Sequence, residues 1–422
     1  MSATVPLTQE ISFDRAASAS VAEKRRVDSV DLLRGLIMVI MMLDHTRDFV
    51  HRDAFTFDPT DVNKTWPLLF FTRWITHFCA PLFVFLAGTG SYFQGMRGKA
   101  KSDLSRFLVS RGIWLIVLEL LVIRPLIFFN FHYNILVAFL QVMWAIGWSM
   151  IVLAAVIHLP RRAIIISSIA VIALHNLLDS VHTTTWRGPG SPVPGFLASL
   201  WKILHEQSVI FPFGAHGPMA LALYPLIPWV AVMAAGYAVG SVYGLEGKTR
   251  RELLYKMGGA TTLGFFILRG INVYGDPVKW AHYPTLAKTV MSFFAVSKYP
   301  PSLLYLMMTI GPGLIFLAWF DDRKRGALSR IFIVYGRVPL FFYVLQWLTA
   351  HTIAVVASLI VGKPTAFLFS DLGFGPPPPS TFGFGLGTVF VFWLIGAALL
   401  YPLCKWFAGV KARRKDWWLS YM

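Results

Sequence analysis

The first long apolar run of the chain reads Val30-Asp-Leu-Leu-Arg-Gly-Leu-Ile-Met-Val-Ile-Met-Met-Leu-Asp-His-Thr-Arg47. It is long enough for a helix that crosses a membrane, yet it carries ionisable groups at both ends, which is costly unless they have a use. Arg34 and His45 are eleven residues apart, so a helix places them on the same face, roughly 16 Å apart along its axis. This geometry favours a site that holds an anionic reactant near one membrane surface and carries out proton chemistry more than halfway across.

The composition is that of a membrane protein with many spans. The 422 residues are 56% apolar and only 14% charged, and 15 of them are tryptophan, whereas about a quarter of a typical soluble chain is charged. We therefore expect an all-α polytopic membrane protein. Apolar runs of about 20 residues predict ten transmembrane helices, at approximately 30–50, 74–96, 107–128, 135–158, 161–180, 219–243, 256–272, 302–320, 331–359 and 383–408.

The net charge of +17 reports membrane topology rather than nucleic-acid binding. When the N-terminus is placed in the cytoplasm, 24 of the 38 Lys and Arg residues fall in cytoplasmic tails and loops and 10 in the opposite loops. Because cytoplasmic loops are enriched in Lys and Arg, this partition predicts an even number of spans with both termini cytoplasmic. Three longer loops on the other side, about 51–73, 181–218 and 273–301, are expected to roof a concave site.

The chain divides into one membrane domain and two tails. Residues 1–27 lack the apolar core of a cleavable signal peptide, so we expect a disordered cytoplasmic tail. Residues 28–408 form one transmembrane domain without internal repeats. Residues 409–422 mix cations with aromatic side chains, as an interfacial anchor does. Cys79 and Cys404 lie near opposite membrane faces in this topology, so they should not form a disulfide.

The first span supplies the main candidates for catalysis. His45 is a candidate general base, because imidazole titrates close to working pH and because Asp44 precedes it. His51, just beyond the span, is its rival. Asp31 and Arg34 are three residues apart and can form an ion cluster at the cytoplasmic end. Structural alternatives are an Arg34 that reaches the membrane interface and an Asp44 that belongs to a solvated helix end.

Further pocket candidates lie inside or beside other spans. Glu119 in the third span needs a partner or a proton. Arg124 is a candidate partner, and a polar tie between helices is the alternative role of both. His77 begins the second span on the outer side. Gln141 and most other intramembrane polar groups are expected to join helices by hydrogen bonds. No Walker, His-Glu-x-x-His or Cys-x-x-Cys motif occurs, and the eleven histidines lack metal-ligand spacing, so no metal is predicted.

The segment from Asp28-Ser-Val-Asp-Leu-Leu-Arg-Gly-Leu-Ile to Leu43-Asp-His45 resembles the start of bacterial members of the heparan-α-glucosaminide N-acetyltransferase catalytic-domain family. The Arg34-x10-His45 spacing is also similar to the Arg/Lys-x10-His signature of the type-3 membrane acyltransferases, a related ten-helix superfamily. The resemblance covers nearly the whole chain through Phe57-Asp-Pro-Thr60, Thr72-Arg-Trp-Ile-Thr-His-Phe-Cys-Ala-Pro-Leu-Phe-Val-Phe-Leu-Ala-Gly88, Lys298-Tyr-Pro-Pro-Ser-Leu-Leu-Tyr305 and Tyr335-Gly-Arg-Val-Pro-Leu-Phe-Phe-Tyr-Val-Leu345.

This resemblance implies an acyltransferase of the bacterial inner membrane. It would move an acyl group, acetyl in the first place, from cytoplasmic acetyl-CoA or another acyl-CoA to an extracytoplasmic sugar or other amine or hydroxyl. Arg34, with Asp31 beside it, would lie on the acyl-CoA path, and His45 would be the catalytic histidine. In the lysosomal member an Asn stands at the place of His45 and the catalytic His falls in the following loop, which leaves His51 as the rival. Direct transfer and transfer through an acyl-histidine both stay open.

Two other classes of function stay open from the residues alone. A secondary transporter or proton-coupled permease is the main alternative, because helices broken by Pro and Gly are common in transporters, and His45, Glu119 and Arg124 could serve a proton path. The lack of visible inverted halves argues against it. A structural scaffold is the third possibility, disfavoured by the cost of so many buried ionisable groups.

Overall fold

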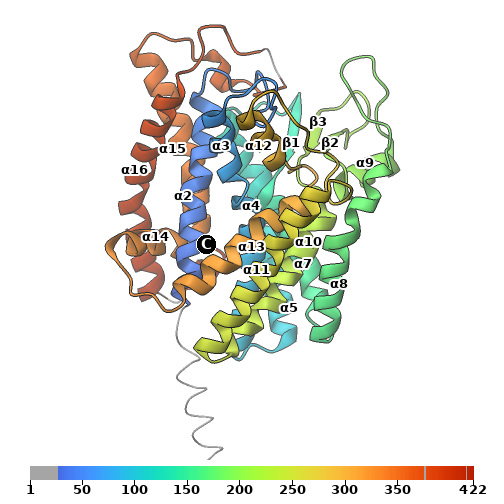
Figure 1. Ribbon diagram of the computed structural model, residues 1–422. Helices are drawn as coiled ribbons and strands as arrows, with labels where there is room; N and C mark the ends of the chain where they lie inside the picture. Colours follow the sequence, from blue (N-terminus) through green and yellow to red (C-terminus); the bar gives the residue numbers. More distant parts are fainter. Residues whose placement is uncertain (1–26, 375–376, 415) are drawn as a thin grey trace, which may run out of the picture.

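The computed structural model describes residues 27–374, 377–414 and 416–422, and these form a bundle of helices (Figure 1). Residues 1–26 of the predicted tail 1–27 therefore lie outside the described residues. The helices, labelled as in Figure 1, are α2 (Asp28–Val50), α3 (Pro67–Thr76), α4 (Cys79–Met96), α5 (Lys101–Leu118), α6 (Arg124–Phe128), α7 (Val142–Val156), α8 (Arg161–Leu174), α9 (Phe196–Leu204), α10 (Leu226–Gly240), α11 (Gly247–Ile271), α12 (Leu286–Phe294), α13 (Leu303–Phe320), α14 (Ala327–Arg337), α15 (Pro339–Ile360) and α16 (Leu386–Arg413). A π-helical turn, Glu119–Ile123, joins α5 to α6, and 3₁₀ turns occupy His175–Ser180, Ser241–Gly244, Ala366–Phe369 and Trp417–Ser420.

The described residues confirm a mostly helical membrane protein. Six of their helical segments are long and apolar enough to cross a membrane, namely Pro67–Met96, Arg161–Ser180, Leu226–Gly244, Leu303–Phe320, Pro339–Ile360 and Leu386–Arg413. The other four predicted ranges also hold helices, which are α2, α5 with α6, α7 and α11. Ten crossings and cytoplasmic termini stay predictions. In Figure 1, α2 begins and α16 ends at the same end of the bundle, as an even number of crossings requires.

The fold departs from the predicted all-α class by one small sheet, near α9 in Figure 1. Strand β1 (Leu136–Leu140) pairs in parallel with β3 (Met219–Ala222), and β2 (Ser208–Ile210) pairs antiparallel with β3. The predicted spans 135–158 and 219–243 therefore begin as strands. The reason is that a short apolar run reads alike as a buried strand and as a buried helix turn.

One predicted span, 331–359, is two helices. Helix α14 ends at Arg337 and α15 begins at Pro339, and Val338 between them is not helical, with φ −132° and ψ 51°. Proline lacks a backbone N–H and disfavours the helical conformation in the residue before it. The break turns the chain beside the first turns of α2, against which both α14 and α15 pack.

Glycines let α2 and α14 touch backbone to backbone. A Cβ atom on Gly35 would lie 1.8 Å from the carbonyl oxygen of Phe332, and one on Gly336 would lie 1.8 Å from that of Asp31. No larger residue fits at either place unless the helices separate. This close crossing fixes the start of α15 beside the turn of α2 that carries Arg34.

Two helices present apolar surfaces to the outside of the bundle. Only 22% of the membrane-crossing window is buried in both Arg161–Ser180 and Leu386–Arg413. Their exposed side chains are large and aliphatic, for example Ile166, Ile169 and Leu394. Contiguous apolar surface of this kind marks contact with lipid in a chain that crosses a membrane.

Candidate active site

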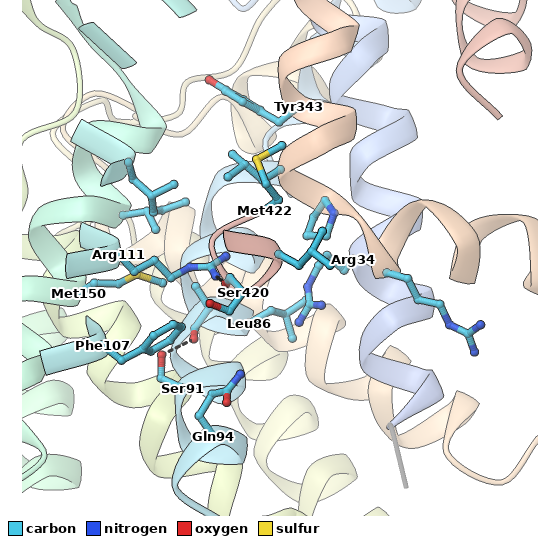
Figure 2. A pocket seen from close by; sticks show the side chains of 18 of the residues that line it. Arg34, Leu86, Ser91, Gln94, Phe107, Arg111, Met150, Tyr343, Ser420 and Met422 are labelled. Carbon is cyan, nitrogen blue, oxygen red and sulfur yellow. Dashed lines mark hydrogen bonds between the residues drawn. The ribbon is translucent and has the colours of Figure 1, made fainter. Parts of the chain in front are cut away.

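A cavity of about 500 Å³ lies among α2, α4, α5, α7, α15 and the segment after α16 (Figure 2). We call it the basic cavity. One part of its wall is apolar and includes Leu86, Leu115, Ile146, Met150 and Leu340. Its size is in the range of cavities that hold cofactors and drug-sized ligands.

The charges on the basic cavity are strongly unbalanced. Arg34 and Arg111 reach into it from α2 and α5 (Figure 2). Among the described residues, six basic side chains and one carboxylate line it, namely Arg34, Arg97, Arg111, Arg337, Lys411, Arg414 and Asp416. Guanidinium groups form strong charge-assisted hydrogen bonds with phosphate oxygens. A ligand that combines phosphate groups with an apolar arm fits this lining.

The segment 416–422 folds back into the basic cavity. Ser420 and Met422 line it (Figure 2). Arg111 donates a hydrogen bond to the carbonyl oxygen of Ser420, and Lys411 Nζ donates one to that of Met422 at 2.8 Å. The two tryptophans at the start of the segment are exposed, where an interfacial anchor would need them. The anchor role of residues 409–422 stays a prediction.

A second cavity, the inner cavity, has a volume of about 30 Å³, which is room for about one water molecule. Its lining residues are Met41, Asp44, His45, Thr76, Cys79, Ala80, Phe83, Gln141, Val142, Tyr224, Lys298 and Tyr343. Phe83 of α4 and Tyr343 of α15 line both cavities. The basic cavity and the inner cavity therefore share a wall made of aromatic rings.

The imidazole of His45 lines the inner cavity and has no hydrogen-bond partner among the described residues. Its ring stacks on Trp347 of α15, with the ring centroids 3.6 Å apart and the planes 20° apart. Neither ring nitrogen is hydrogen-bonded to any described residue, and Nδ1 is buried without a partner. An imidazole that is oriented by stacking, with its nitrogens available, can accept a proton from a bound reactant.

Asp44 is held by other groups and does not orient His45. Its carboxylate accepts hydrogen bonds from Arg73 and, at 3.0 Å, from Thr76 Oγ1. Arg47 lies 2.6 Å away on the next turn of α2. The predicted alternative of a solvated helix end is wrong, because Asp44 is buried. Its contacts join α2 to α3 at the wall of the inner cavity.

His51 lines neither cavity. It follows the last residue of α2, and its backbone pairs with Phe384 in an isolated bridge. Its Nδ1 accepts a hydrogen bond from the backbone N–H of Asp53 at 3.3 Å. Burial lowers the pKa of His51 below its ordinary value, so the ring is neutral at pH 7. These contacts stabilise the turn that leaves the helix.

Arg34 and His45 face different cavities from one unbroken helix. Helix α2 is continuous from Asp28 to Val50, so the separation of roughly 16 Å expected from helix geometry applies. Arg34 lines the basic cavity and His45 lines the inner cavity. Arg34 Nη1 donates to Asp31 Oδ1 at 3.2 Å and to the carbonyl oxygen of Gly336 at 3.3 Å. Asp31 accepts this hydrogen bond from Arg34 but lines neither cavity.

Glu119 and Arg124 are not partners of each other. Glu119 Oε2 accepts a hydrogen bond from the backbone N–H of Met143 at 3.0 Å, in the first turn of α7, where free N–H groups attract a carboxylate. Arg124 pairs with Asp371 at 3.0 Å and donates to Asn130 Oδ1 at 2.7 Å. Both lie outside the two cavities. Of their two predicted roles, these contacts match the polar tie between segments.

His77 lies at the break between α3 and α4, next to the inner cavity but not on it. Its carbonyl oxygen accepts a hydrogen bond from Tyr305 Oη at 2.9 Å. Thr76 before it and Cys79 after it do line the inner cavity. The thiols of Cys79 and Cys404 are both free, which confirms that they form no disulfide.

Lys298, Tyr224 and Tyr343 line the inner cavity but were absent from the candidates drawn from the sequence. Lys298 comes from the link before α13, Tyr224 precedes α10 and Tyr343 lies in α15. Gln141, expected only to join helices, also lines the cavity, and its Nε2 has no partner among the described residues. The segments of family resemblance that contain Lys298 and Tyr343 were the signal that could have found those two.

Within the described residues, no group of three or more His, Cys, Asp or Glu side chains is arranged to hold a metal ion. Comparison with family models matches residues 26–270 to the family described as heparan-alpha-glucosaminide N-acetyltransferase, catalytic. The match covers α2, the walls that α4, α5 and α7 contribute, and Tyr224, and it ends before Lys298 and the segment Tyr335–Leu345. None of the curated proteins compared with the chain matches it.

Proposed function

This chain belongs to the heparan-α-glucosaminide N-acetyltransferase catalytic-domain family of membrane acyltransferases, and from that premise we propose that it transfers a short acyl group from cytoplasmic acyl-CoA to an extracytoplasmic acceptor. The observation that carries this proposal is the wall of Phe83 and Tyr343 shared by the two cavities. It separates a large cavity rich in cations from a small cavity that contains His45.

The basic cavity is the proposed binding site for CoA. The 3′-phosphate and the diphosphate of CoA are matched by the cluster of arginines, with Arg34 as one of the phosphate ligands. The pantetheine arm is matched by the apolar wall that leads to Phe83 and Tyr343. The excess of Lys and Arg in the same end of the bundle supports a cytoplasmic position for this opening.

The inner cavity is the proposed site of the acyl group and favours a small one. Its volume of about 30 Å³ is far too small for a long acyl chain, so a short acyl group at the shared wall is favoured. Acetyl-CoA is therefore the favoured acyl donor.

His45 is the proposed general base. It takes the proton from an acceptor amine or hydroxyl as that group attacks the thioester carbon, and the imidazolium then protonates the CoA thiolate that leaves. Trp347 keeps the ring in orientation. Asp44 lies at the wall of the same cavity, where Arg47 and Arg73 pair with its carboxylate. A sugar amine is the favoured acceptor by family membership, and the bacterial inner membrane is the proposed location.

The decisive experiment is an assay of acyl transfer by the purified protein in liposomes. Acetyl-CoA labelled in the acetyl group is supplied on one side and glucosamine on the other, and labelled product and CoA thiol are both measured. We expect release of thiol that matches product formation, with acetyl-CoA preferred over long-chain acyl-CoA. A trial without acceptor separates the two mechanisms, since only an acyl-histidine would leave label on the protein. Uptake of the amino sugar without release of CoA thiol would support the permease alternative instead.

A further inference from the structure

The link between α12 and α13 is fixed on both sides of Lys298. The Oδ2 atom of Asp276 accepts hydrogen bonds from the backbone N–H of Ser297 at 2.9 Å and from Ser302 Oγ at 2.6 Å. The backbone of Lys298 itself pairs with Pro301 in an isolated bridge. A short loop that is bonded at both ends and across its middle holds its side chains in defined directions. Lys298 is therefore built into the wall of the inner cavity and is not a mobile surface lysine.

The ammonium group of Lys298 has no counter-ion in the inner cavity. Among the described residues, Nζ makes no hydrogen bond and no ion pair, and it lies 5.2 Å from the ring centroid of Tyr299. The carboxylate that lines the same cavity, Asp44, is already held by two arginines. Lys298 is partly buried, and a cation that is removed from water without a counter-ion is costly unless a reactant supplies negative charge.

We propose that Lys298 is a catalytic residue that stabilises the oxyanion formed on the acyl group during transfer, an inference that rests on the proposed function. Among the described residues that line the inner cavity, Lys298 carries the one full positive charge. Gln141 and Tyr343, on the same cavity, offer neutral hydrogen-bond donors. Developing charge on an oxygen is stabilised most by a fixed, charged donor in a site from which water is excluded.

The chemical step balances with groups already present. The lone pair of the acceptor forms a bond to the thioester carbon, and the π electrons of the carbonyl move to its oxygen, which Lys298 binds. His45 takes the acceptor proton. When the carbonyl re-forms, the carbon–sulfur bond breaks and the CoA thiolate receives that proton, so the products are the acylated acceptor and CoA. Lys298 stays protonated throughout.

The test compares Lys298→Met with wild type, because methionine keeps much of the side-chain length and removes the charge. We expect kcat to fall by about 10²–10³, the usual effect of losing one oxyanion donor. The dissociation constant of CoA, which has no acyl carbonyl, should not change. Lys298→Arg keeps the charge and should keep more of kcat than Lys298→Met. Lys64→Met, at an exposed lysine of an outer loop, is the matched control and should behave as wild type.

The experiment separates failure of the proposed function from failure of the role of Lys298. A wild type that transfers no acetyl group would contradict the proposed function itself. An active wild type with an unchanged kcat in Lys298→Met would overturn the role of Lys298, and so would a weaker affinity for CoA that accounts for the whole loss. If Lys298→Met does not fold, Lys298→Arg is compared with Lys298→Gln at equal thermal stability. A higher kcat in the charged variant supports the proposal, and equal values refute it.

Discussion

Replacement of Arg34 by alanine is the sharpest test of the basic cavity. Arg34 faces this cavity, and its Nη1 is fixed by Asp31 and by the carbonyl oxygen of Gly336. A guanidinium group that is held in place before the ligand arrives loses little freedom on binding a phosphate. A charge-assisted hydrogen bond contributes about 1.5–3 kcal/mol, so the dissociation constant of CoA should rise by roughly 10- to 150-fold.

The lower half of that range is the expected result. Arg34 is 19% exposed at its side chain, and five other basic groups of the described chain line the same cavity. Solvent and neighbouring charges therefore weaken the contribution of this one contact. Arg34→Gln keeps the hydrogen-bonding ability without the charge and should lie between alanine and wild type. The weakening should also shrink when the salt concentration is raised, because part of the wild-type affinity is electrostatic.

The assay is equilibrium titration of the purified protein with CoA, with thermal unfolding as the check on folding. Arg251→Ala is the matched control, since Arg251 forms an ion pair with Asp322 at 3.3 Å and does not line the basic cavity. Its affinity for CoA should equal that of wild type. A folded Arg34→Ala protein that binds CoA as tightly as Arg251→Ala does would return Arg34 to the role of an interfacial cation.

Three further predictions concern His45, the end of the chain and topology. His45→Ala should abolish acyl transfer and leave CoA binding intact, whereas His51→Ala should lower activity by less. An inactive His51 variant beside a near-normal His45 variant would instead assign catalysis to His51, in the loop after α2. Deletion of 416–422 should lower the dissociation constant of CoA by about fivefold, the equivalent of roughly 1 kcal/mol, because Arg111 no longer donates to Ser420. A higher dissociation constant after the deletion would instead make this segment part of the CoA site. Reporter fusions after residue 100 and at the C-terminus should read cytoplasmic and one near residue 195 external; a cytoplasmic signal at residue 195 would contradict the ten-span topology.

The sequence predicts those parts of the site that depend on a single helix. Arg34 and His45 fall on one face because α2 has no break between Asp28 and Val50, and helix geometry alone then sets their spacing. The locations of the long helices follow equally from apolar runs. The short strand Leu136–Leu140 was not predicted, because five apolar residues before a helix have no periodicity that separates strand from helix.

The parts that depend on contacts between distant segments could not be predicted. Arg124 and Asp371 are 247 residues apart, so no spacing rule connects them, and the nearer Glu119 was the wrong partner. Lys298 was named only as part of a segment of family resemblance and was given no role, yet the fold brings it to the cavity of His45. Burial reverses the expectation for Asp44 in the same way, since α3 covers what would otherwise be a solvated helix end.

Under the proposed function, the division into two cavities would let one site serve two sides of a membrane without transporting CoA. The cations that suit CoA phosphates lie on the far side of Phe83 and Tyr343 from His45. Movement of a highly charged nucleotide past that aromatic wall would cost much free energy, because the phosphates would lose their counter-ions and enter a cavity of about 30 Å³. We therefore propose that only the acyl end of the donor reaches His45 and Lys298. Under the proposed function, the wall that positions the thioester is therefore also the barrier that keeps CoA on its own side, and the acceptor must approach from the opposite one.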